Sequence, residues 1–382
     1  MFIVYHIMIE KIQMVDLHSQ YLRLKPEIDA AMQSVWDATA FINGPQVKEF
    51  ASRLAAYLSI AHVLPCGNGT DALQIALMGL ELEPGDEVIV PAFTYVAAVE
   101  VIALLGYTPV LVDVDPHTFN IDAHQLEEAL SSRTRAIVVV HLFGQCADMN
   151  PVLEIASRHD LYVIEDNAQS VGATYTFPDG SIRQAGTMGH IGTTSFFPSK
   201  PLACYGDGGA MMTADEELAD RLHKIANHGQ GKKYHHERIG CNSRLDTLQA
   251  AILNVKLTYM DAFTKARRQV AARYDEAFQA NEFIVTPHKA IYSTHVYHQY
   301  TLQVKEGKRD DLQAYLLEKG IPSMVYYPFP VHEQEAFREL VRTPLPLQEA
   351  VRLSRSVLSL PIHTEMTTAE QEYIIETINS YA

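Results

Sequence analysis

Between residues 88 and 164 the chain repeats one pattern, a short apolar run followed by a stretch with helix-like spacing. The four runs have strand length and are rich in Val and Ile; they cover residues 88–91, 110–114, 136–142 and 162–164. The stretches between them cover residues 97–105, 123–131 and 152–159. A strand with almost no polar residue has both faces buried, and strands that alternate with helices run parallel. The sequence therefore predicts an α/β fold with a mostly parallel sheet between helices.

The flanking segments extend this fold. Helices are expected over residues 46–58, which follow Pro45, and over residues 72–80; strands are expected over 193–197 and 210–213, and a long helical region over 245–278. The region from 285 onwards is typical of a small α/β domain, with strands at 298–304 and 323–327 and a helix at 310–319 that Gly320 ends. We expect a large domain over residues 1–260 and a smaller one over 261–382, which a chain of 382 residues can accommodate.

The charge and the cysteines exclude several classes of protein. A net charge of −16 disfavours nucleic acid or an anionic membrane as the main partner. None of the four cysteines forms a CxxC pair, so a disulfide scaffold or zinc site is disfavoured and a cytoplasmic protein with reduced thiols is expected. The apolar run over residues 1–8 lacks a basic flank and is too short for a membrane helix. We interpret it as an extra start or an edge strand, with Met8 and Met14 as further candidate starts.

A glycine-rich motif, Gly67-Asn68-Gly69-Thr70-Asp71, opens the expected helix over residues 72–80. Glycines allow a ligand close to the backbone, and the N–H groups at a helix start bind phosphate. The motif is neither a Walker P-loop nor GxGxxG. The alternative is a tight turn with Thr70 or Asp71 as the helix N-cap.

Two further motifs follow buried strands. Asp166 comes at the carboxyl end of the run over 162–164, the edge where open parallel sheets bind ligands. A carboxylate there can pair with a protonated pyridine nitrogen, although a helix N-cap or a surface ion pair is an alternative. Lys200 lies 34 residues (200 − 166) further on, just past the next expected strand, in a loop shaped by proline and glycine. A Schiff-base lysine needs a lowered pKa, which burial supplies; the alternative is a solvated loop lysine.

The glycine-rich motif, Asp166 and Lys200 occur along the chain in the order expected of residues that bind one cofactor. The chain resembles the DegT-type nucleotide-sugar aminotransferases, a branch of the fold-type-I pyridoxal-phosphate enzymes. The resemblance runs from about Val15 to the C-terminus, and its motifs cover residues 68–73, 165–169, 195–200 and 242–246.

The resemblance implies a role for each matching residue. Lys200 would form the Schiff base with pyridoxal 5′-phosphate and act as the proton carrier, with pyridoxamine phosphate as the intermediate form of the cofactor. Asp166 would hold the pyridinium and Gln169 would contact the ring oxygen. The remaining cofactor contacts would be the backbone of Gly69 and Thr70, the Ser195 hydroxyl and the Tyr95 ring, which otherwise packs in the core. Asn242 would reach the phosphate from a neighbouring subunit, so a homodimer with shared sites is implied.

Three residues are implied at the substrate. Arg244 would lie beside the site, where a guanidinium can grip a carboxylate. His228 begins a basic stretch over residues 228–238, which meets a diphosphate or sugar carboxylate, or else is a solvated mobile loop. No further ligands stand at finger spacing from the paired histidines of this stretch, so no metal is expected. Tyr327 would form part of the substrate wall.

Within the family, motifs over residues 144–148, 198–205 and 234–240 most resemble the subgroup that aminates UDP-2-acetamido-2-deoxy-3-oxo-glucuronate on the way to bacterial surface polysaccharide. L-Glutamate would be the amino donor. That subgroup tends to carry His-Tyr-Pro where this chain has Tyr326-Tyr327-Pro328, so another keto sugar, 4-keto or dTDP-linked, stays an alternative. A sugar dehydratase of the same family carries histidine in place of Lys200. The fold also accommodates a desulfurase, an aldolase or a non-catalytic regulator.

Overall fold

The computed structural model describes residues 11–381 and contains the expected central sheet. Seven strands lie in the order β1 (His62–Cys66), β9 (Gly209–Thr213), β8 (Ile191–Ser195), β5 (Tyr162–Asp166), β4 (Thr134–Val140), β2 (Glu87–Pro91) and β3 (Thr108–Val112). The pairs from β8 to β3 are parallel, whereas β9 is antiparallel to both β8 and β1. The mostly parallel sheet is thus confirmed, and the segment 1–8 lies outside the described residues.

Helices cover both faces of this sheet, which explains the unbroken apolar runs. Along β2, Val88 and Val90 belong to one hydrophobic cluster while Ile89 belongs to another on the opposite face. The first cluster includes α3 (Gly69–Gly79), α4 (Ala97–Leu104) and α7 (Glu216–Ala226); the second includes α6 (Met149–Arg158). Since successive residues of a strand point to opposite faces, every position in such a strand must be apolar.

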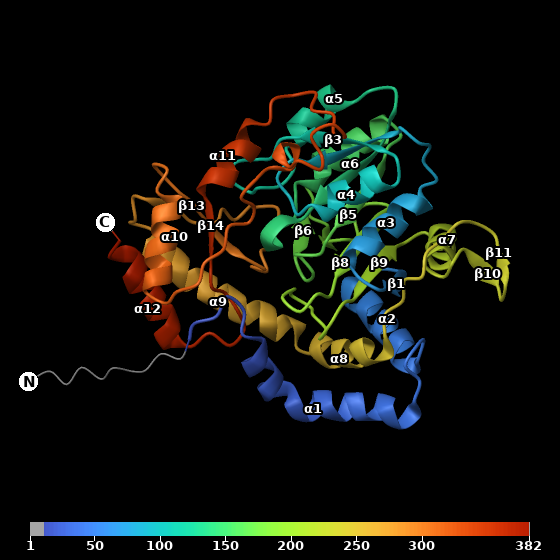
Figure 1. Ribbon diagram of the computed structural model, residues 1–382, viewed down its shortest axis with the longest axis horizontal. Coiled ribbons are helices and arrows are strands. Elements are labelled where there is room, and N and C mark those ends of the chain that lie inside the picture. The colour runs from blue at the N-terminus through green and yellow to red at the C-terminus, as the bar shows by residue number, and fades with distance from the viewer. Residues whose placement is uncertain (1–10, 382) are drawn as a thin grey trace, which may run out of the picture.

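A third cluster lies beyond β9 and contains α1 (Leu17–Ala38), α2 (Pro45–Leu58) and α8 (Thr247–Leu257). In Figure 1 these helices form the lower layer, and α8 continues into α9 (Met260–Phe278). The expected helical region over 245–278 is therefore two helices. The chain tightens between them, because the Thr258 and Tyr259 amides bond to carbonyls three residues back.

The C-terminal part has its own three-stranded antiparallel sheet, with the strand order β12 (Ile284–Val285), β13 (Tyr300–Val304) and β14 (Val357–Leu360). The helices α10 (Arg309–Glu318) and α12 (Thr368–Asn379) pack with this sheet in a fourth cluster, beside the second half of α9. The segment with η3 (Val331–Glu333) and α11 (Gln348–Ser356) packs instead against the large sheet's core. The division at 260/261 stays a prediction.

Two expected elements are wrong or shorter than expected. Residues 323–327 form no strand; a single bridge from Met324 to Ser359 is their pairing, and prolines at 322 and 328 flank the segment. The helix expected over 123–131 is reduced to the turn η1 (Ala123–Gln125) and the short α5 (Leu126–Ala129). Gly320 has a φ of +74° directly after α10, as expected of a residue that ends a helix.

An unexpected hairpin, β10 (Gln230–Lys232) and β11 (His235–His236), lies within the basic stretch. Figure 1 shows it projecting beyond α7, away from the body of the molecule. Among residues 11–381, no helix is long and apolar enough to cross a membrane.

Candidate active site

The carboxyl ends of the parallel strands bring together residues that lie far apart in the sequence. Asp166 is the last residue of β5, and Ser195 is the last residue of the neighbouring β8. Lys200 follows β8 by five residues (200 − 195), in a turn where its amide donates to the Phe197 carbonyl at 2.8 Å. This edge is the one at which open α/β sheets bind ligands, so the structure gives the two motifs a common location.

Asp166 and Lys200 influence each other's charge. Burial raises the pKa of the Asp166 carboxyl, while the Ala168 amide, which donates to Oδ1 at 3.0 Å, and the charge of Lys200 act in the opposite direction. Burial likewise lowers the pKa of Lys200, and the Asp166 charge opposes this shift. The Asp166 carboxylate and the Lys200 amine thus lie within electrostatic reach of each other in a largely buried site. A cation close to Asp166 is favoured there, and burial favours the neutral form of the Lys200 amine.

The start of α3 forms a cradle with β8. Asn68 is the N-cap, since its Oδ1 accepts from the Asp71 amide at 2.8 Å, so the alternative of Thr70 or Asp71 as the cap is wrong. A Cβ added at Gly69 would lie 2.6 Å from Ser195 Cβ and 3.2 Å from its Oγ. The glycine is therefore required for this close approach, which leaves helix-start amides next to a serine hydroxyl.

The buried Ser243 fixes the loop before this cradle. Its Oγ accepts from the Gly67 amide at 2.8 Å and donates to Asp71 Oδ2 at 2.6 Å. Sequence reasoning missed Ser243. Its position directly after Asn242, within the motif over residues 242–246, could have indicated that it lies near the site.

Gln169 and Tyr327 form one wall of the site. The Gln169 Oε1 accepts from the Phe143 amide at 2.8 Å, and its Nε2 donates to the Tyr327 hydroxyl at 3.1 Å. The Tyr95 ring centroid lies 6.2 Å from that of Tyr327, and Tyr95 is 57% exposed. A ring so exposed does not pack in the core, which leaves its face available for a ligand.

A buried polar network lies behind Asp166 and was missed by sequence reasoning. The neighbouring Glu165 is fully buried, and its Oε2 lies 2.7 Å from Nε2 of the buried His141. The Ala147 amide donates to His141 Nδ1 at 3.1 Å, so the ring proton is on Nε2 and is donated to Glu165.

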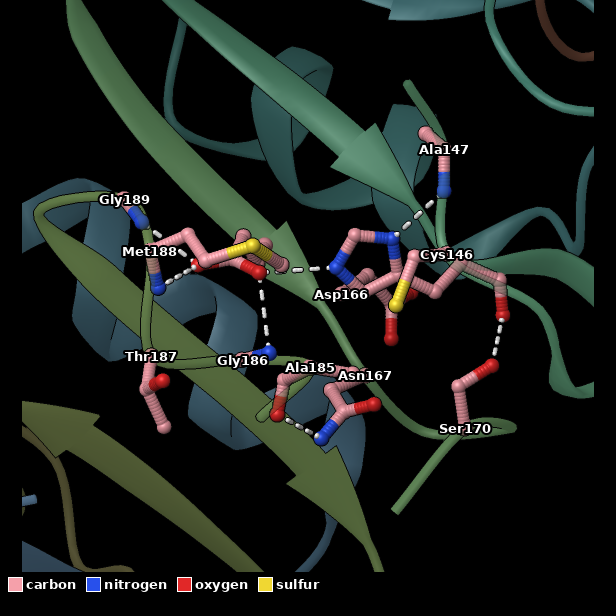
Figure 2. A network of polar contacts seen from close by, with 12 residues as sticks. Cys146, Ala147, Asp166, Asn167, Ser170, Ala185, Gly186, Thr187, Met188 and Gly189 are labelled. Carbon is pink, nitrogen blue, oxygen red and sulfur yellow. Dashed lines mark hydrogen bonds and ion pairs between the residues drawn. The ribbon is translucent and has the colours of Figure 1, made fainter. Parts of the chain in front are cut away.

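The loop after β7 (Ile182–Gln184) supplies three more donors to this carboxylate. Figure 2 shows the amides of Gly186, Met188 and Gly189 directed at it. The Gly186 amide donates to Oε2 at 2.8 Å, and the Met188 and Gly189 amides donate to Oε1 at 2.6 and 2.5 Å. Four donors converge on the two oxygens of this buried carboxylate, and they fix the end of β5 from which Asp166 projects.

Three of the residues expected to act from a second subunit or on the substrate lie near the base of the hairpin. His228 and Asn242 are exposed and flank the base of the hairpin, where Asn242 bridges to Asn227. Arg244 follows, half-buried. No hydrogen bond or ion pair among residues 11–381 joins these three to Asp166 or Lys200, although Ser243, which separates Asn242 from Arg244, accepts from the Gly67 amide beside the cradle.

The residues of this edge fit pyridoxal phosphate. The Gly69–Ser195 cradle accommodates a phosphate, Asp166 is a buried carboxylate for a ring nitrogen, and Lys200 is an amine beside it. The buried Oγ1 of Thr94, next to Tyr95, has no partner among the described residues. Within residues 11–381 no group of three or more His, Cys, Asp or Glu residues is placed to hold a metal ion.

Comparison with known proteins agrees with this site. Residues 23–379 match the DegT/DnrJ/EryC1/StrS aminotransferase family. The chain is 46% identical over 363 residues to the UDP-2-acetamido-2-deoxy-3-oxo-D-glucuronate aminotransferase of Pseudomonas aeruginosa, covering 95% of this chain and 98% of that protein. It is 45% identical over 372 residues to a pleiotropic regulatory protein of Geobacillus stearothermophilus (97% and 98% covered). It is 38% identical over 374 residues to the dTDP-3-amino-3,4,6-trideoxy-alpha-D-glucose transaminase of Streptomyces venezuelae (97% and 96%).

Solved structures agree as well. A DegT DnrJ EryC1 StrS aminotransferase from Brucella abortus has a TM-score of 0.92 at 41% identity, covering 97% of this chain and 99% of that one. The ntda protein from Bacillus subtilis, solved with bound cofactor PMP, has a TM-score of 0.88 at 31% identity, covering 97% and 85%.

Fold and site together define a pyridoxal-phosphate-dependent sugar aminotransferase. The chain belongs to the DegT/DnrJ/EryC1/StrS aminotransferase family, as its sequence motifs predicted.

Proposed function

We propose that the protein transfers the amino group of L-glutamate to the keto group of UDP-2-acetamido-2-deoxy-3-oxo-D-glucuronate, giving the 3-amino sugar for surface polysaccharide or O-antigen. The observation that carries the reaction is the convergence of Asp166, Lys200 and the Gly69–Ser195 cradle at one edge of the sheet. The relative at 46% identity supports the substrate. The reaction takes place in the cytoplasm, which agrees with the reduced thiols expected of the four cysteines.

The chain's own residues divide the work of this reaction. Bound pyridoxal phosphate would supply an electron sink that stabilises negative charge on the substrate carbon. The Asp166 carboxylate would keep the ring nitrogen protonated, and the amides of Gly69 and Thr70 with the Ser195 hydroxyl would hold the phosphate. Lys200 Nζ, which burial favours in its neutral form, would take the proton from the α-carbon of the amino donor and pass it to the cofactor's aldehyde carbon. In the second half of the reaction it would carry a proton in the opposite direction, to the sugar carbon that receives the amino group.

The wall and the hairpin would hold the substrates. Gln169, which would contact the ring oxygen of the cofactor, fixes the Tyr327 hydroxyl, and Tyr327 would orient the sugar. The exposed Tyr95 ring would cover the cofactor face. The exposure of Asn242 and His228 fits a homodimer in which these residues, with Arg244, complete the partner's site. Gel filtration with light scattering tests the dimer, and a monomeric mass in an active preparation would contradict it.

The substrate is tested by offering the purified, cofactor-loaded enzyme L-glutamate together with each of a panel of nucleotide-linked keto sugars. Formation of a 3-amino sugar from the UDP-linked 3-oxo-glucuronate, at a kcat/KM above that for dTDP-linked or 4-keto sugars, is expected. Lys200→Ala is the control, and we expect it to lose turnover while it still binds the cofactor. Near-normal turnover by Lys200→Ala would refute the role of the lysine.

The same reaction on a dTDP-linked sugar is a second candidate, because the Streptomyces venezuelae relative acts on such sugars and is 38% identical. A regulatory role is a third, since the Geobacillus stearothermophilus protein is named for regulation. A non-catalytic regulator has no need of Lys200, Asp166 and Gln169, and this chain keeps all three. Shift of the cofactor's absorbance band on addition of glutamate would favour catalysis, and no shift would favour regulation.

A further inference from the structure

The loop that carries Lys200 has few hydrogen bonds to the rest of the molecule. It covers residues 196–208, between β8 and β9, and contains no helix or strand. Two backbone hydrogen bonds close it, from the Cys204 amide to the Phe196 carbonyl at 2.8 Å and from the Phe196 amide to the Gly208 carbonyl at 2.7 Å. Both bonds are internal, so they shape the loop but do not attach it to a neighbouring helix.

Gln249, on α8, holds this loop from outside. Its Oε1 accepts from the Tyr205 amide at 2.9 Å, and its Nε2 donates to the Tyr205 carbonyl at 3.4 Å. Apart from a bond to the preceding Ser195, these are the only hydrogen bonds among residues 11–381 that join the loop to another segment. A Cβ at Gly206 would lie 3.0 Å from Gln249 Nε2, so the glycine leaves room for the amide.

The Tyr205 side chain is also held, by two helices. Its ring centroid lies 6.0 Å from that of Tyr21 on α1, edge to face, and 5.0 Å from Lys256 Nζ on α8. Lys256 is 1% exposed, so its amine meets the face of the Tyr205 ring inside the protein, where a cation–π contact is stronger than at the surface. Tyr205 is therefore a fixed point five residues (205 − 200) after Lys200.

The helix that holds the lysine loop is also connected with the phosphate cradle. Ser243, four residues (247 − 243) before α8 begins, accepts from the Gly67 amide at 2.8 Å and donates to Asp71 Oδ2 at 2.6 Å. One continuous segment thus bonds to the cradle at one end and to the lysine loop at the other. A cofactor that is held at its phosphate and joined to Lys200 at its aldehyde requires a fixed distance between these two parts of the site.

We propose that Gln249 is a positioning residue for Lys200, because its amide holds the loop in the arrangement that brings the lysine amine to the cofactor's aldehyde. Without the two bonds to Tyr205, the loop populates arrangements in which the amine lies out of reach. The fraction of the protein that is ready to bond the cofactor then falls, and the affinity for pyridoxal phosphate falls with it. The inference rests on the proposed role of Lys200.

The test compares two forms of the cofactor in titrations of the apoprotein. The aldehyde of pyridoxal phosphate condenses with the Lys200 amine and releases water, whereas pyridoxamine phosphate has no aldehyde and forms no bond with the lysine. Gln249→Met keeps the length of the side chain but has no amide. It should bind pyridoxal phosphate about tenfold more weakly than wild type, as the loss of one to two net hydrogen bonds predicts, and pyridoxamine phosphate within about twofold.

Asn254→Ala is the matched control, because Asn254 also lies on α8 but bonds away from the loop. Its Nδ2 donates to the Gln46 carbonyl at 3.0 Å, and its Oδ1 accepts from Arg53 Nη1 at 3.2 Å. This variant should bind both forms of the cofactor as wild type does. A selective loss of pyridoxal phosphate binding in Asn254→Ala would show that loosening of α8, and not the Gln249 amide, is responsible.

Wild-type affinity of Gln249→Met for pyridoxal phosphate, or an equal loss for both forms of the cofactor, would overturn the proposal. If Gln249→Met fails to fold, hydrogen exchange of the wild-type apoprotein replaces it. The Tyr205 amide should then exchange as slowly as the Cys204 amide, and faster exchange counts against the proposal.

The role of Lys200 is judged separately, by borohydride reduction of the wild-type holoenzyme and location of the attached cofactor. Attachment at another lysine would refute the proposed function. Attachment at Lys200 together with wild-type binding by Gln249→Met would refute the role of Gln249 alone.

Discussion

Glu165→Gln should destabilise the protein strongly although it changes no shape and touches no substrate. The carboxylate accepts two donors at each oxygen, His141 Nε2 and the Gly186 amide at Oε2, and the Met188 and Gly189 amides at Oε1. A glutamine has one carbonyl oxygen, so its NH2 group must face one of these pairs of donors whichever way the amide is turned.

Neither orientation can be repaired locally. If the NH2 group faces Oε1's donors, two backbone N–H groups lose their acceptor. If the NH2 group faces the donors of Oε2, His141 Nε2 can accept a hydrogen bond from it only when the ring proton moves to Nδ1. The Nδ1–H group and the Ala147 N–H group are then two donors that face each other. Two unsatisfied buried groups at about 1–3 kcal/mol each give a loss of about 2–6 kcal/mol in the free energy of unfolding. This is a large share of the roughly 5–15 kcal/mol typical of a folded protein.

Urea denaturation of the apoprotein measures this loss. The matched control is Glu127→Gln, which removes a carboxylate from an ion pair with Arg158 whose two side chains are more than half exposed, and it should cost less than about 1 kcal/mol. A Glu165→Gln variant within about 0.5 kcal/mol of wild type would refute the reasoning, because the four donors would then not depend on the charge. Unfolding measured with cofactor present should show the same order of variants.

Two further predictions concern the cofactor-binding edge. Asp166→Asn should cut the rate of transamination by several powers of ten, and it should stabilise the apoprotein at pH 7 relative to wild type. The pKa of Asp166 is raised in the folded protein, so the wild type loses stability as the pH rises from the unfolded pKa, near 3.8, through the folded pKa. Below that pH window the difference in stability between the two proteins should vanish. Equal apoprotein stability at both ends of this range would contradict it. Gly69→Ala places a methyl group 2.6 Å from Ser195 Cβ. It should weaken the binding of pyridoxal phosphate to the apoprotein at least about tenfold, roughly 1.4 kcal/mol, in titrations. The control is Gly79→Ala, at the other end of α3 where the Leu222 side chain can move, and it should bind pyridoxal phosphate normally.

The order of the motifs along the chain predicted which residues the structure brings to one edge of the sheet. Asp166 and Lys200 were each recognised because they follow an apolar run, and a polar residue directly after a buried strand lies at the ligand-binding edge. The same reasoning did not find Glu165, although it is Asp166's neighbour. Its partner His141 is 24 residues away, and no local pattern shows that a loop of three amides closes around it.

The sequence by itself determined the architecture, because strand-length apolar runs such as residues 88–91, repeated between helix-like stretches, predict parallel strands buried on both faces. Tertiary structure decided the contacts between distant segments. Gln169 bonds to Tyr327, 158 residues further along the chain, and Tyr327 belongs to the segment 323–327, which forms a single bridge and no strand. The periodicity of the sequence shows which face of a helix or strand is buried. Which side chains that face contacts depends on how the elements pack on one another, and this packing depends on residues throughout the chain.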